Sequence, residues 1–379
     1  MRRALHFFAT FVPGGTELRG VTLMNTLGDR WEHRVAAMDD RLDALERVDP
    51  GIACQGLAGP GTKAARAVQR WVLDVVEREQ PDVVLSYGWG AFDAVIAARR
   101  AGLLHHVHHE DGFNQDEAEG QLLRRRLARR WLLPRVPRLV VPSTGLADLA
   151  RATWGVREER LRLIPNGVDV ERFRPLDARV RAEVRAELGI PEDARVVVTA
   201  AGYRRVKRLD RLIDAVQTIG DVGGPVHLLL AGDGPERDAL AARAATAGSL
   251  GAERVHLLGF RADLPRVHAA ADVFCLSSDS EQQPVSLLEA MACGLPAVCT
   301  DVGDCAVTLG PLADGALVDP REPASALGAA LGSLLADPAV RVRRGAAARE
   351  RVLAEFTLDR MVAAHEATWT SVLRPASGT

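Results

Sequence analysis

The sequence has almost no lysine, few aromatic residues and no long apolar run. Only Lys63 and Lys207 are lysines among 48 basic residues, so arginine supplies nearly all of the positive charge. The formal net charge is −2, which gives no overall electrostatic footprint for nucleic acid and leaves any anionic partner to a local patch. We therefore expect a small ligand rather than a nucleic acid. No stretch of about 18 apolar residues is present, so no membrane-spanning helix is predicted.

Cysteine usage and the N-terminal residues exclude further classes of protein. The five cysteines are odd in number and contain no C-x-x-C pair, which argues against a disulfide framework. Cys293, Cys299 and Cys305 recur regularly, but their spacing is not that of a metal site, so we expect no bound metal. No basic start is followed by an apolar stretch and a small-residue cleavage site. We therefore expect a cytoplasmic protein.

Alternation of apolar runs with helical patterns predicts an α/β fold with mostly parallel sheets. Such runs occur up to about residue 166, and the same rhythm restarts at residue 196. The expected strands are 5–9, 35–38, 83–87, 104–109, 139–141 and 161–164 in the first part, and 196–200, 226–230, 255–258, 273–276 and 297–300 in the second.

The length of 379 residues suggests two domains of ordinary size. A turn-forming Ile-Pro-Asn-Gly-Val-Asp cluster at residues 164–169 marks the join. We expect an N-terminal domain over residues 1–174 and a second domain over residues 175–355. The helical C-terminal segment 356–379 could cross back to the first domain.

The segment from Ser277 to Pro296 is the most informative part of the chain. It follows an apolar strand, and Pro284 near the first position with Gly294 past the last predicts a short helix. Glu281 falls on the loop after the strand, where ligands of parallel α/β sheets bind. Glu289 lies in an otherwise apolar helix, where a carboxylate needs a partner. Taken alone, the two glutamates also fit a solvated loop residue and a helix residue paired with arginine.

Four further loops carry residues that suit an anion. Gly14 and Gly15 follow the first strand, where paired glycines free backbone amides at a helix N-terminus; an ordinary tight turn is the alternative. The loop 202–208 gathers four cations that repel one another unless an anion or carboxylates neutralise them; a solvated basic loop is the alternative. Gly232 and Gly259 end two further strands. All these loops are expected at one edge of their sheets.

A histidine cluster follows a predicted strand in the first domain. Residues 105–111 hold His105, His106, His108 and His109 together with two acids, and His106 and His108 alternate onto one face. The pattern is not H-E-x-x-H, which weakens a metal interpretation. A histidine presented from the strand end to a sugar or phosphate is the favoured interpretation.

A basic segment from Arg124 to Arg138 also allows two interpretations. Leu123, Leu127 and Trp131 stand four residues apart, with arginines on the remaining faces. This composition fits an amphipathic helix in peripheral contact with the inner face of an anionic membrane. We favour the alternative, a surface helix whose Leu/Trp stripe is buried in the domain core.

Together these motifs resemble those of the retaining glycosyltransferases of family 4. The resemblance runs nearly end to end and is more specific in the second domain. It implies an α/β GT-B fold: two Rossmann-like, doubly wound domains with a cleft between them and a C-terminal helix that crosses back. It also implies transfer of a hexose-type sugar from a nucleotide diphosphate sugar to an acceptor hydroxyl. The matching segments are Gly14–Gly15, 164–169, 202–207, 232–235, Gly259 and 281–296.

The resemblance implies roles for residues of the second domain. Arg204 and Lys207 would hold the donor diphosphate and stabilise the leaving group. Glu281 would contact hydroxyls of the donor sugar, and Glu289 would contact those of the ribose. The remaining donor contacts implied are Gly14, Gly15, Arg205, Gly232, Gly259, Phe260, Gln282, Gln283, Pro284 and Val285.

From the first domain, His108 or the neighbouring His109 would face the transferred sugar. Similar enzymes transfer the sugar with retention by a same-face route in which the leaving phosphate takes the acceptor proton. The resemblance therefore implies neither a hydrolase-type carboxylate pair nor a metal or other cofactor. The acceptor, whether a glycan, a lipid-linked compound or a small molecule, depends on first-domain loops and stays open.

Two departures from the family pattern leave alternatives open. Gln282, Gln283 and Pro284 follow the first glutamate where many relatives place glycine. The loop 202–207 is one residue shorter than the commoner form, so Arg204 and Arg205 are alternatives for one role. Two other functions also stay open: a sugar-nucleotide epimerase, which uses the donor site without an external acceptor, and a non-enzymatic two-domain sugar-binding protein.

Overall fold

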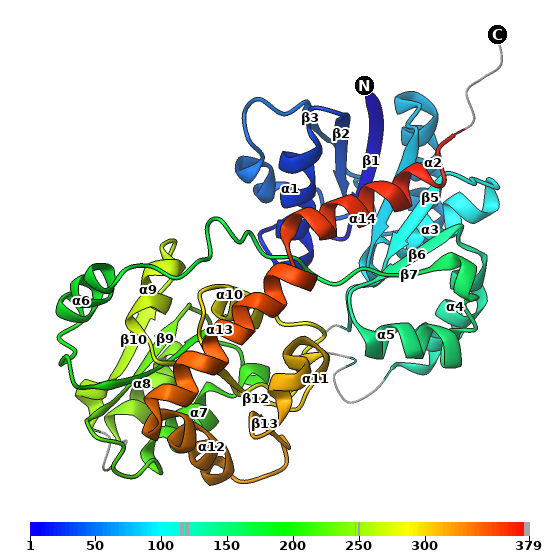
Figure 1. Ribbon diagram of the computed structural model, residues 1–379. Coiled ribbons are helices and arrows are strands. Elements are labelled where there is room, and N and C mark those ends of the chain that lie inside the picture. Colours follow the sequence, from blue (N-terminus) through cyan, green and yellow to red (C-terminus); the bar gives the residue numbers. More distant parts are fainter. Residues whose placement is uncertain (114–116, 118–120, 247, 249–250, 375–379) are drawn as a thin grey trace. The chain divides into compact units, whose positions relative to one another are not determined.

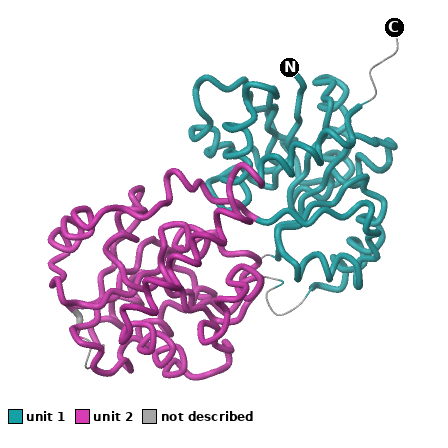
Figure 2. Tube along the Cα trace, viewed as in Figure 1, with its two compact units in different colours: residues 1–165, 361–379 teal, residues 166–360 magenta. Residues whose placement is uncertain are grey.

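The computed structural model describes residues 1–113, 117, 121–246, 248 and 251–374, and the chain forms two compact units (Figure 2). Unit 1 comprises Met1–Pro165 together with Met361–Thr379, and unit 2 comprises Asn166–Arg360. Each unit is built on its own parallel sheet (Figure 1). The predicted α/β class with two Rossmann-like sheets is confirmed.

Unit 1 contains a seven-stranded parallel sheet in the order β3-β2-β1-β4-β5-β6-β7. Its central strands are buried on both faces, as expected where helices cover a parallel sheet; Leu85 and Val107, for example, are fully buried. The strands are β1 (Arg2–Phe8), β2 (Trp31–Ala37), β3 (Cys54–Leu57), β4 (Val83–Tyr87), β5 (His106–His109), β6 (Arg138–Val141) and β7 (Leu161–Leu163).

The helices of unit 1 include one from the C-terminal end of the chain. On α14, Trp369 lies edge-on to Trp31, with ring centroids 5.5 Å apart, and the Trp31 indole N–H donates to Glu366 at 3.1 Å. The chain thus returns to its first unit. The helices are α1 (Gly15–Leu27), α2 (Ala65–Glu79), α3 (Phe92–Arg100), α4 (Leu123–Leu132), α5 (Thr144–Leu149) and α14 (Leu358–Thr370).

Unit 2 contains a six-stranded parallel sheet in the order β10-β9-β8-β11-β12-β13. Side chains of β8 alternate between two cores: Val196 and Val198 belong to one apolar cluster, and Val197 belongs to the other. Both faces of this sheet are therefore covered. The strands are β8 (Arg195–Ala200), β9 (Val226–Ala231), β10 (Val255–Gly259), β11 (Val273–Leu276), β12 (Ala297–Thr300) and β13 (Leu317–Val318).

The helices of unit 2 precede the first strand, alternate with the strands and follow the last one. The predicted short helix after Pro284 is α10, and Gly294 beyond its end has a φ of +79°, a conformation that suits glycine. The helices are α6 (Ala178–Glu187), α7 (Leu209–Gln217), α8 (Arg237–Ala245), α9 (Leu264–Ala270), α10 (Val285–Ala292), α11 (Cys305–Leu309), α12 (Ala324–Ala336) and α13 (Pro338–Glu355).

The structure divides the chain earlier than the predicted boundary at residues 174–175. The Val168 amide donates to the Phe356 carbonyl, and the Leu358 amide donates to the Val168 carbonyl, both at 2.9 Å. Phe173 is buried in the core of unit 2. These contacts place residues 166–174 in unit 2, because they tie that segment to the end of α13.

Helix α4 turns its Leu/Trp stripe to solvent, which is the opposite of the favoured prediction. Leu123, Leu127 and Trp131 are 61%, 54% and 59% exposed, whereas Arg125 and Arg129 are buried. The prediction that the Leu/Trp stripe is buried in the domain core is therefore wrong. The buried arginines pair with carboxylates of the preceding segment, which the spacing of the apolar residues does not reveal.

In both sheets the strand order reverses beside the first strand. In unit 1 the chain builds outward from β1 through β2 and β3, then returns to β4 on the other side of β1. In unit 2 it does the same from β8, with β11 on the other side. The carboxyl ends of β1 and β4, and of β8 and β11, are therefore the positions where open α/β sheets bind ligands.

Candidate functional site

The loops after β8 and β11 are joined by an ion pair at the reversal point of unit 2. The Lys207 ammonium donates to Glu281 Oε1 at 2.6 Å, and the Ser278 hydroxyl donates to the same oxygen at 2.6 Å. Lys207 and Glu281 are 18% and 11% exposed. Among the described residues Glu281 Oε2 has no hydrogen-bond partner, so one oxygen is held in place while the other stays available.

Backbone contacts fix the two loops against each other. The Asp279 amide donates to the Val206 carbonyl at 2.8 Å, and the Ser277 hydroxyl donates to the Lys207 carbonyl at 2.9 Å. Arg211 on α7 donates to the Asp279 carboxylate at 2.6 Å. Lys207 and Glu281 thus stand on loops that are braced independently of their own ion pair.

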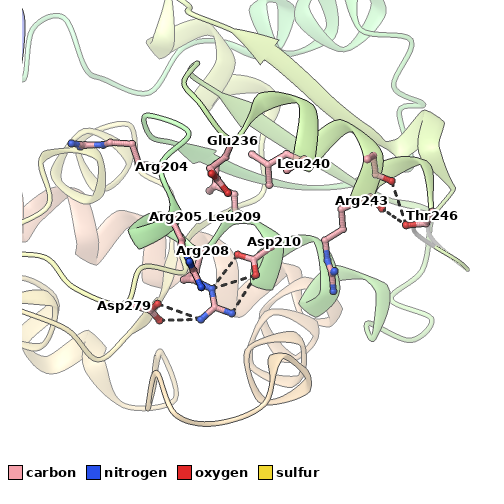
Figure 3. Close-up of a pocket in the computed structure, with 12 residues that line it drawn as sticks. Arg204, Arg205, Arg208, Leu209, Asp210, Glu236, Leu240, Arg243, Thr246 and Asp279 are labelled. Carbon is pink, nitrogen blue, oxygen red and sulfur yellow. Dashed lines mark hydrogen bonds and ion pairs between the residues drawn. The ribbon is translucent and has the colours of Figure 1, made fainter. Parts of the chain in front are cut away.

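Arg204 and Arg205 make no side-chain hydrogen bond or ion pair with any described residue. Figure 3 shows their side chains diverging: Arg205 runs toward Arg208, whereas Arg204 extends away from it. A β-carbon built on Gly202 would lie 3.7 Å from Arg204 Nε, so the Arg204 side chain passes close to this glycine. The two alternatives for the predicted role therefore point in different directions.

A cavity of about 680 Å³ beside η7 (Arg205–Lys207), α7 and α8 shares only part of this site (Figure 3). Arg208 on its wall pairs with Asp210 and Asp279. Lys207, Glu281 and Glu289 do not line it. We assign the candidate site to the reversal point rather than to this cavity, because the carboxylates around it already neutralise Arg208. Its lining is Arg204, Arg205, Arg208, Leu209, Asp210, Glu236, Ala239, Leu240, Ala242, Arg243, Thr246 and Asp279.

The predicted glycine loops meet at the same edge of the sheet. The Gly232 amide donates to the Gly259 carbonyl at 2.8 Å. Gly232 has a φ of +139°, and a β-carbon there would lie 1.9 Å from the Ala201 carbonyl oxygen, so only glycine allows this approach. The Phe260 side chain beside them is 74% exposed. An aromatic face is thus open next to the glycines.

The Glu289 side chain has no hydrogen bond or ion pair with any described residue. Burial raises the pKa of its carboxyl to about 7, and the Arg172 cation opposes that rise. The carboxyl lies on α10, whose neighbouring positions Leu288 and Ala290 are fully buried. The side chain is half-buried, and a partly desolvated carboxyl without a partner is costly to the fold, which is typical of a ligand-binding group.

The Gln-Gln-Pro segment is held within unit 2. The Asp304 amide donates to the Gln282 carbonyl at 2.7 Å. The side-chain oxygen of buried Gln283 accepts from the Asn166 amide, and the Gln283 carbonyl accepts from Asn166 Nδ2 at 3.0 Å. Pro284 caps α10, and Val285 is 42% exposed. The Gln283 side chain therefore has a structural partner, and of these four side chains Val285 is the one most open to a ligand.

In unit 1 the predicted glycines open helix α1. Gly14 precedes the helix in an extended conformation, and the space beside Gly15 is open. The first amides of a helix have no partner within it. Arg19 on the same helix pairs with Asp111 after β5. Burial and the Asp111 charge raise the pKa of Glu17, although its own backbone amide and Arg19 oppose the rise.

The predicted histidines lie inside unit 1. His108 and His109 have no exposed surface. His108 Nδ1 lies 2.8 Å from the Ser86 hydroxyl, and its Nε2 lies 3.7 Å from Glu110 Oε2. Burial lowers the pKa of His109, whose ring stacks on Tyr87. Neither imidazole reaches solvent in this conformation, so contact of either with a sugar stays a prediction without support from its position.

Sequence reasoning missed the side chains that brace the site. Ser278, Asp279 and Arg211 hold the loops around Lys207 and Glu281, and Arg19 pairs with Asp111. The Ser-Ser-Asp-Ser run lies between the strand and Glu281. A polar run directly after a strand is the sequence signal that could have predicted these bracing residues.

The described residues form no metal site and no membrane-spanning helix. No group of three or more His, Cys, Asp or Glu side chains in the described part of the chain is placed to hold a metal ion. All five cysteines are free thiols. Among the described residues no helix combines the length and apolar character needed to cross a bilayer.

Two parallel Rossmann-like sheets, with a cationic and carboxylate site at the reversal point of the second, define a GT-B protein. Family comparisons agree: the Glycosyltransferase Family 4 model matches residues 13–172, and the Glycosyl transferases group 1 model matches residues 180–351. The two matches together cover most of both units. The chain belongs to the family 4 glycosyltransferases.

Individual relatives are similar at lower identity. The 2-deoxystreptamine glucosyltransferase of Streptomyces kanamyceticus is 25% identical over 317 residues, which are 81% of this chain and 79% of that protein. The D-inositol 3-phosphate glycosyltransferase of Xylanimonas cellulosilytica is 32% identical over 209 residues, 53% of this chain and 49% of that one. The chain thus matches only about half the length of the second relative.

Among solved structures, HepE from Anabaena in complex with UDP has a TM-score of 0.83. It is 21% identical in sequence, and the match covers 98% of this chain and 100% of that one. At this identity the likeness supports the fold.

Proposed function

We propose that this protein is a retaining glycosyltransferase that moves a hexose from a nucleotide diphosphate sugar to an acceptor hydroxyl. The observation that carries the proposal is Glu289, a half-buried carboxyl whose side chain has no partner among the described residues, on the helix that follows the Lys207–Glu281 pair. A ribose diol would supply the missing hydrogen bonds to Glu289. A diphosphate would lie beside Lys207 and the unpaired Arg204.

The positive groups of the loop 202–208 suit a leaving diphosphate. As the bond between the sugar and the phosphate oxygen breaks, negative charge grows on that oxygen. Lys207 is held by Glu281 and braced loops, so its ammonium needs little reorganisation to stabilise that charge. Arg204 would supply a second cation.

The sugar-side role falls to Glu281. Its Oε1 accepts from Lys207 and Ser278, while its Oε2 would accept from a sugar hydroxyl. The new bond from the acceptor oxygen to the sugar carbon forms on the face from which the phosphate leaves. The departing phosphate oxygen takes the acceptor proton, so the step needs no separate base.

The direct experiment is a thermal-shift screen of the full chain against nucleoside diphosphates, their sugars and free sugars. A ligand that binds the folded state raises the melting temperature by mass action. We expect a shift with at least one nucleoside diphosphate. A shift with free sugar alone would instead indicate a sugar-binding protein.

Product analysis follows with the donor that gives the shift. The acceptor panel should include 2-deoxystreptamine and D-inositol 3-phosphate, which appear in the names of two relatives. We expect free nucleoside diphosphate and a product of unchanged anomeric configuration, as read by NMR coupling constants. An epimerised nucleotide sugar without free diphosphate would contradict the proposal and indicate an epimerase.

Because Lys207 and Arg204 provide the positive charge, we expect transfer without a divalent metal. Activity should be unchanged after dialysis against EDTA, measured as nucleoside diphosphate release. Loss of activity that returns with added Mg²⁺ or Mn²⁺ would refute the metal-independent part of the proposal.

A further inference from the structure

Helix α4 exposes the side chains that a helix of a globular domain normally buries. Leu123, Leu127 and Trp131 form one outward stripe and are each more than half exposed. An amphipathic surface helix ordinarily turns such a stripe to the core. Here Arg129 has no exposed surface, and Arg125 is 8% exposed. The polarity of this helix is therefore inverted.

A buried charge network holds α4 in this orientation. Arg129 donates to Glu117 at 3.0 Å and to Glu110 at 3.3 Å, and Arg125 donates to Glu117 at 3.0 Å. The Arg129 guanidinium also lies 5.1 Å from the ring centroid of Trp89. Removing a buried charge from its partners is costly, so the helix cannot readily turn its apolar stripe inward.

Arginines flank the outward stripe, and none of them pairs with a carboxylate of the described residues. On α4 itself, Arg124 lies on one side of the stripe and Arg126 and Arg130 lie on the other, as the spacing of 100° per residue places them. The guanidinium groups of Arg99 and Arg135 lie 5.4 and 5.7 Å from the Trp131 ring centroid. The face therefore carries five exposed positive charges around an apolar centre.

We propose that this face of α4 docks unit 1 on an anionic lipid bilayer. The apolar stripe would enter the boundary between headgroups and acyl chains, where indole rings are favourable, while the arginines would reach lipid phosphates. A second copy of the face is a poor occupant, because five positive charges would oppose five others. The inference does not depend on the proposed glycosyl transfer.

The first test measures co-sedimentation of the full chain with vesicles. We expect binding to vesicles of phosphatidylcholine mixed with phosphatidylglycerol, and little binding to phosphatidylcholine alone. The double variant Leu127→Ser/Trp131→Ser should reduce the apparent partition coefficient roughly tenfold or more, because it removes buried apolar area. The matched control is Val342→Ser, at a 74% exposed apolar position on α13; it should bind as wild type.

The second test separates a specific cationic face from general attraction. Arg124→Glu/Arg126→Glu should lower binding to the anionic vesicles roughly tenfold or more, and added salt should weaken wild-type binding. Arg66→Glu/Arg70→Glu changes the net charge equally, at exposed positions of α2, and should have little effect. Equal loss in both charge variants would overturn the proposal.

Two other outcomes would also overturn it. One is the absence of wild-type binding to anionic vesicles. The other is a wild-type dimer, detected by light scattering, that Leu127→Ser/Trp131→Ser converts to a monomer, since that result would assign the face to a second copy. Circular dichroism and melting temperatures matched to wild type would establish that each variant is folded.

Discussion

The two units share a strand order but fill the space beyond their central strands differently. In unit 1, the Tyr87 ring stacks on Phe8 at 4.1 Å and on His109 at 4.5 Å, so aromatic side chains close the ends of β1, β4 and β5. In unit 2, charged groups stand at the corresponding place: Lys207 and Glu281 pair there. The same topology thus carries stacked rings at this end in one unit and an ion pair in the other.

The two units differ in which groups lack a partner. Glu289 has no partner, and Arg204 makes no side-chain bond, among the described residues. In unit 1 Arg19 pairs with Asp111, and the groups that lack a hydrogen bond there include both ring nitrogens of buried His109. Groups without a partner can bind a ligand such as a nucleotide directly. Groups in an ion pair can bind a ligand only if it displaces or shares their partner. The contrast predicts that changes in unit 2 act most strongly on donor chemistry.

The largest expected effect is that of Lys207→Ala. Loss of the ammonium removes charge stabilisation from the leaving diphosphate, so we expect kcat to fall about 100- to 1,000-fold. Steady-state release of nucleoside diphosphate measures this fall. Lys63→Ala removes the other lysine of the chain, at an exposed position of unit 1, and is the matched control. Wild-type turnover in a folded Lys207→Ala protein would exclude the diphosphate role.

The fold was predictable where strands are apolar on both faces. The central strand β11 and its neighbour β12 lie within or match the expected ranges, because uninterrupted burial leaves a continuous apolar run. Two edge strands escaped prediction. β3 reads Cys-Gln-Gly-Leu and β13 has two residues, so neither carries a pattern strong enough to mark a strand.

The site was predictable where residues follow strands, and less so where partners are distant in sequence. Glu281 and Lys207 were expected at one sheet edge, but their direct ion pair depends on how two loops pack. Gln283 was expected near the donor, and its contact with Asn166 comes from far along the chain. The orientation of α4 likewise follows from buried pairing with Glu117, which no periodicity encodes.

A smaller and informative effect is expected for Glu289→Gln. Its folded pKa of about 7 lies above the unfolded value, so wild type loses stability as pH rises from about 4.5 through about 7. The variant should escape that loss and melt at a higher temperature than wild type near pH 8. The difference should shrink as pH falls toward 4.5. Differential scanning calorimetry across this range measures it.

The same substitution should weaken binding of the nucleotide. An amide accepts hydrogen bonds from a diol less strongly than a carboxylate does, so we expect about tenfold lower affinity for the nucleoside diphosphate. Isothermal titration calorimetry tests this expectation. A gain in stability without loss of affinity would exclude Glu289 from nucleotide binding. That result would also remove the main difference between the two units.

The smallest expected effect concerns acid sensitivity and comes from histidine placement. Seven of the ten histidines lie in unit 1. Burial lowers the pKa of His33 and His365 to about 4 and that of His106 to about 3. Stability from these neutral rings is complete above about pH 6.5 and is lost as pH falls toward about 4. In unit 2, burial lowers the pKa of His227 and His268 to about 4. Fewer buried histidines therefore reduce the stability of unit 2 as pH falls.

Hydrogen exchange read by mass spectrometry at about pH 7.5 and pH 5 resolves the two units separately, once intrinsic exchange rates are corrected. Strands β4 and β5 should lose protection at the lower pH before β8 and β11 do, because protonation must break contacts of the buried imidazoles in unit 1 first. His365→Phe keeps the ring packing against His109 and removes one titrating group, so it should narrow the difference. Loss of protection in unit 2 at the same or a higher pH would show that its three histidines, or its carboxylates, control acid unfolding instead.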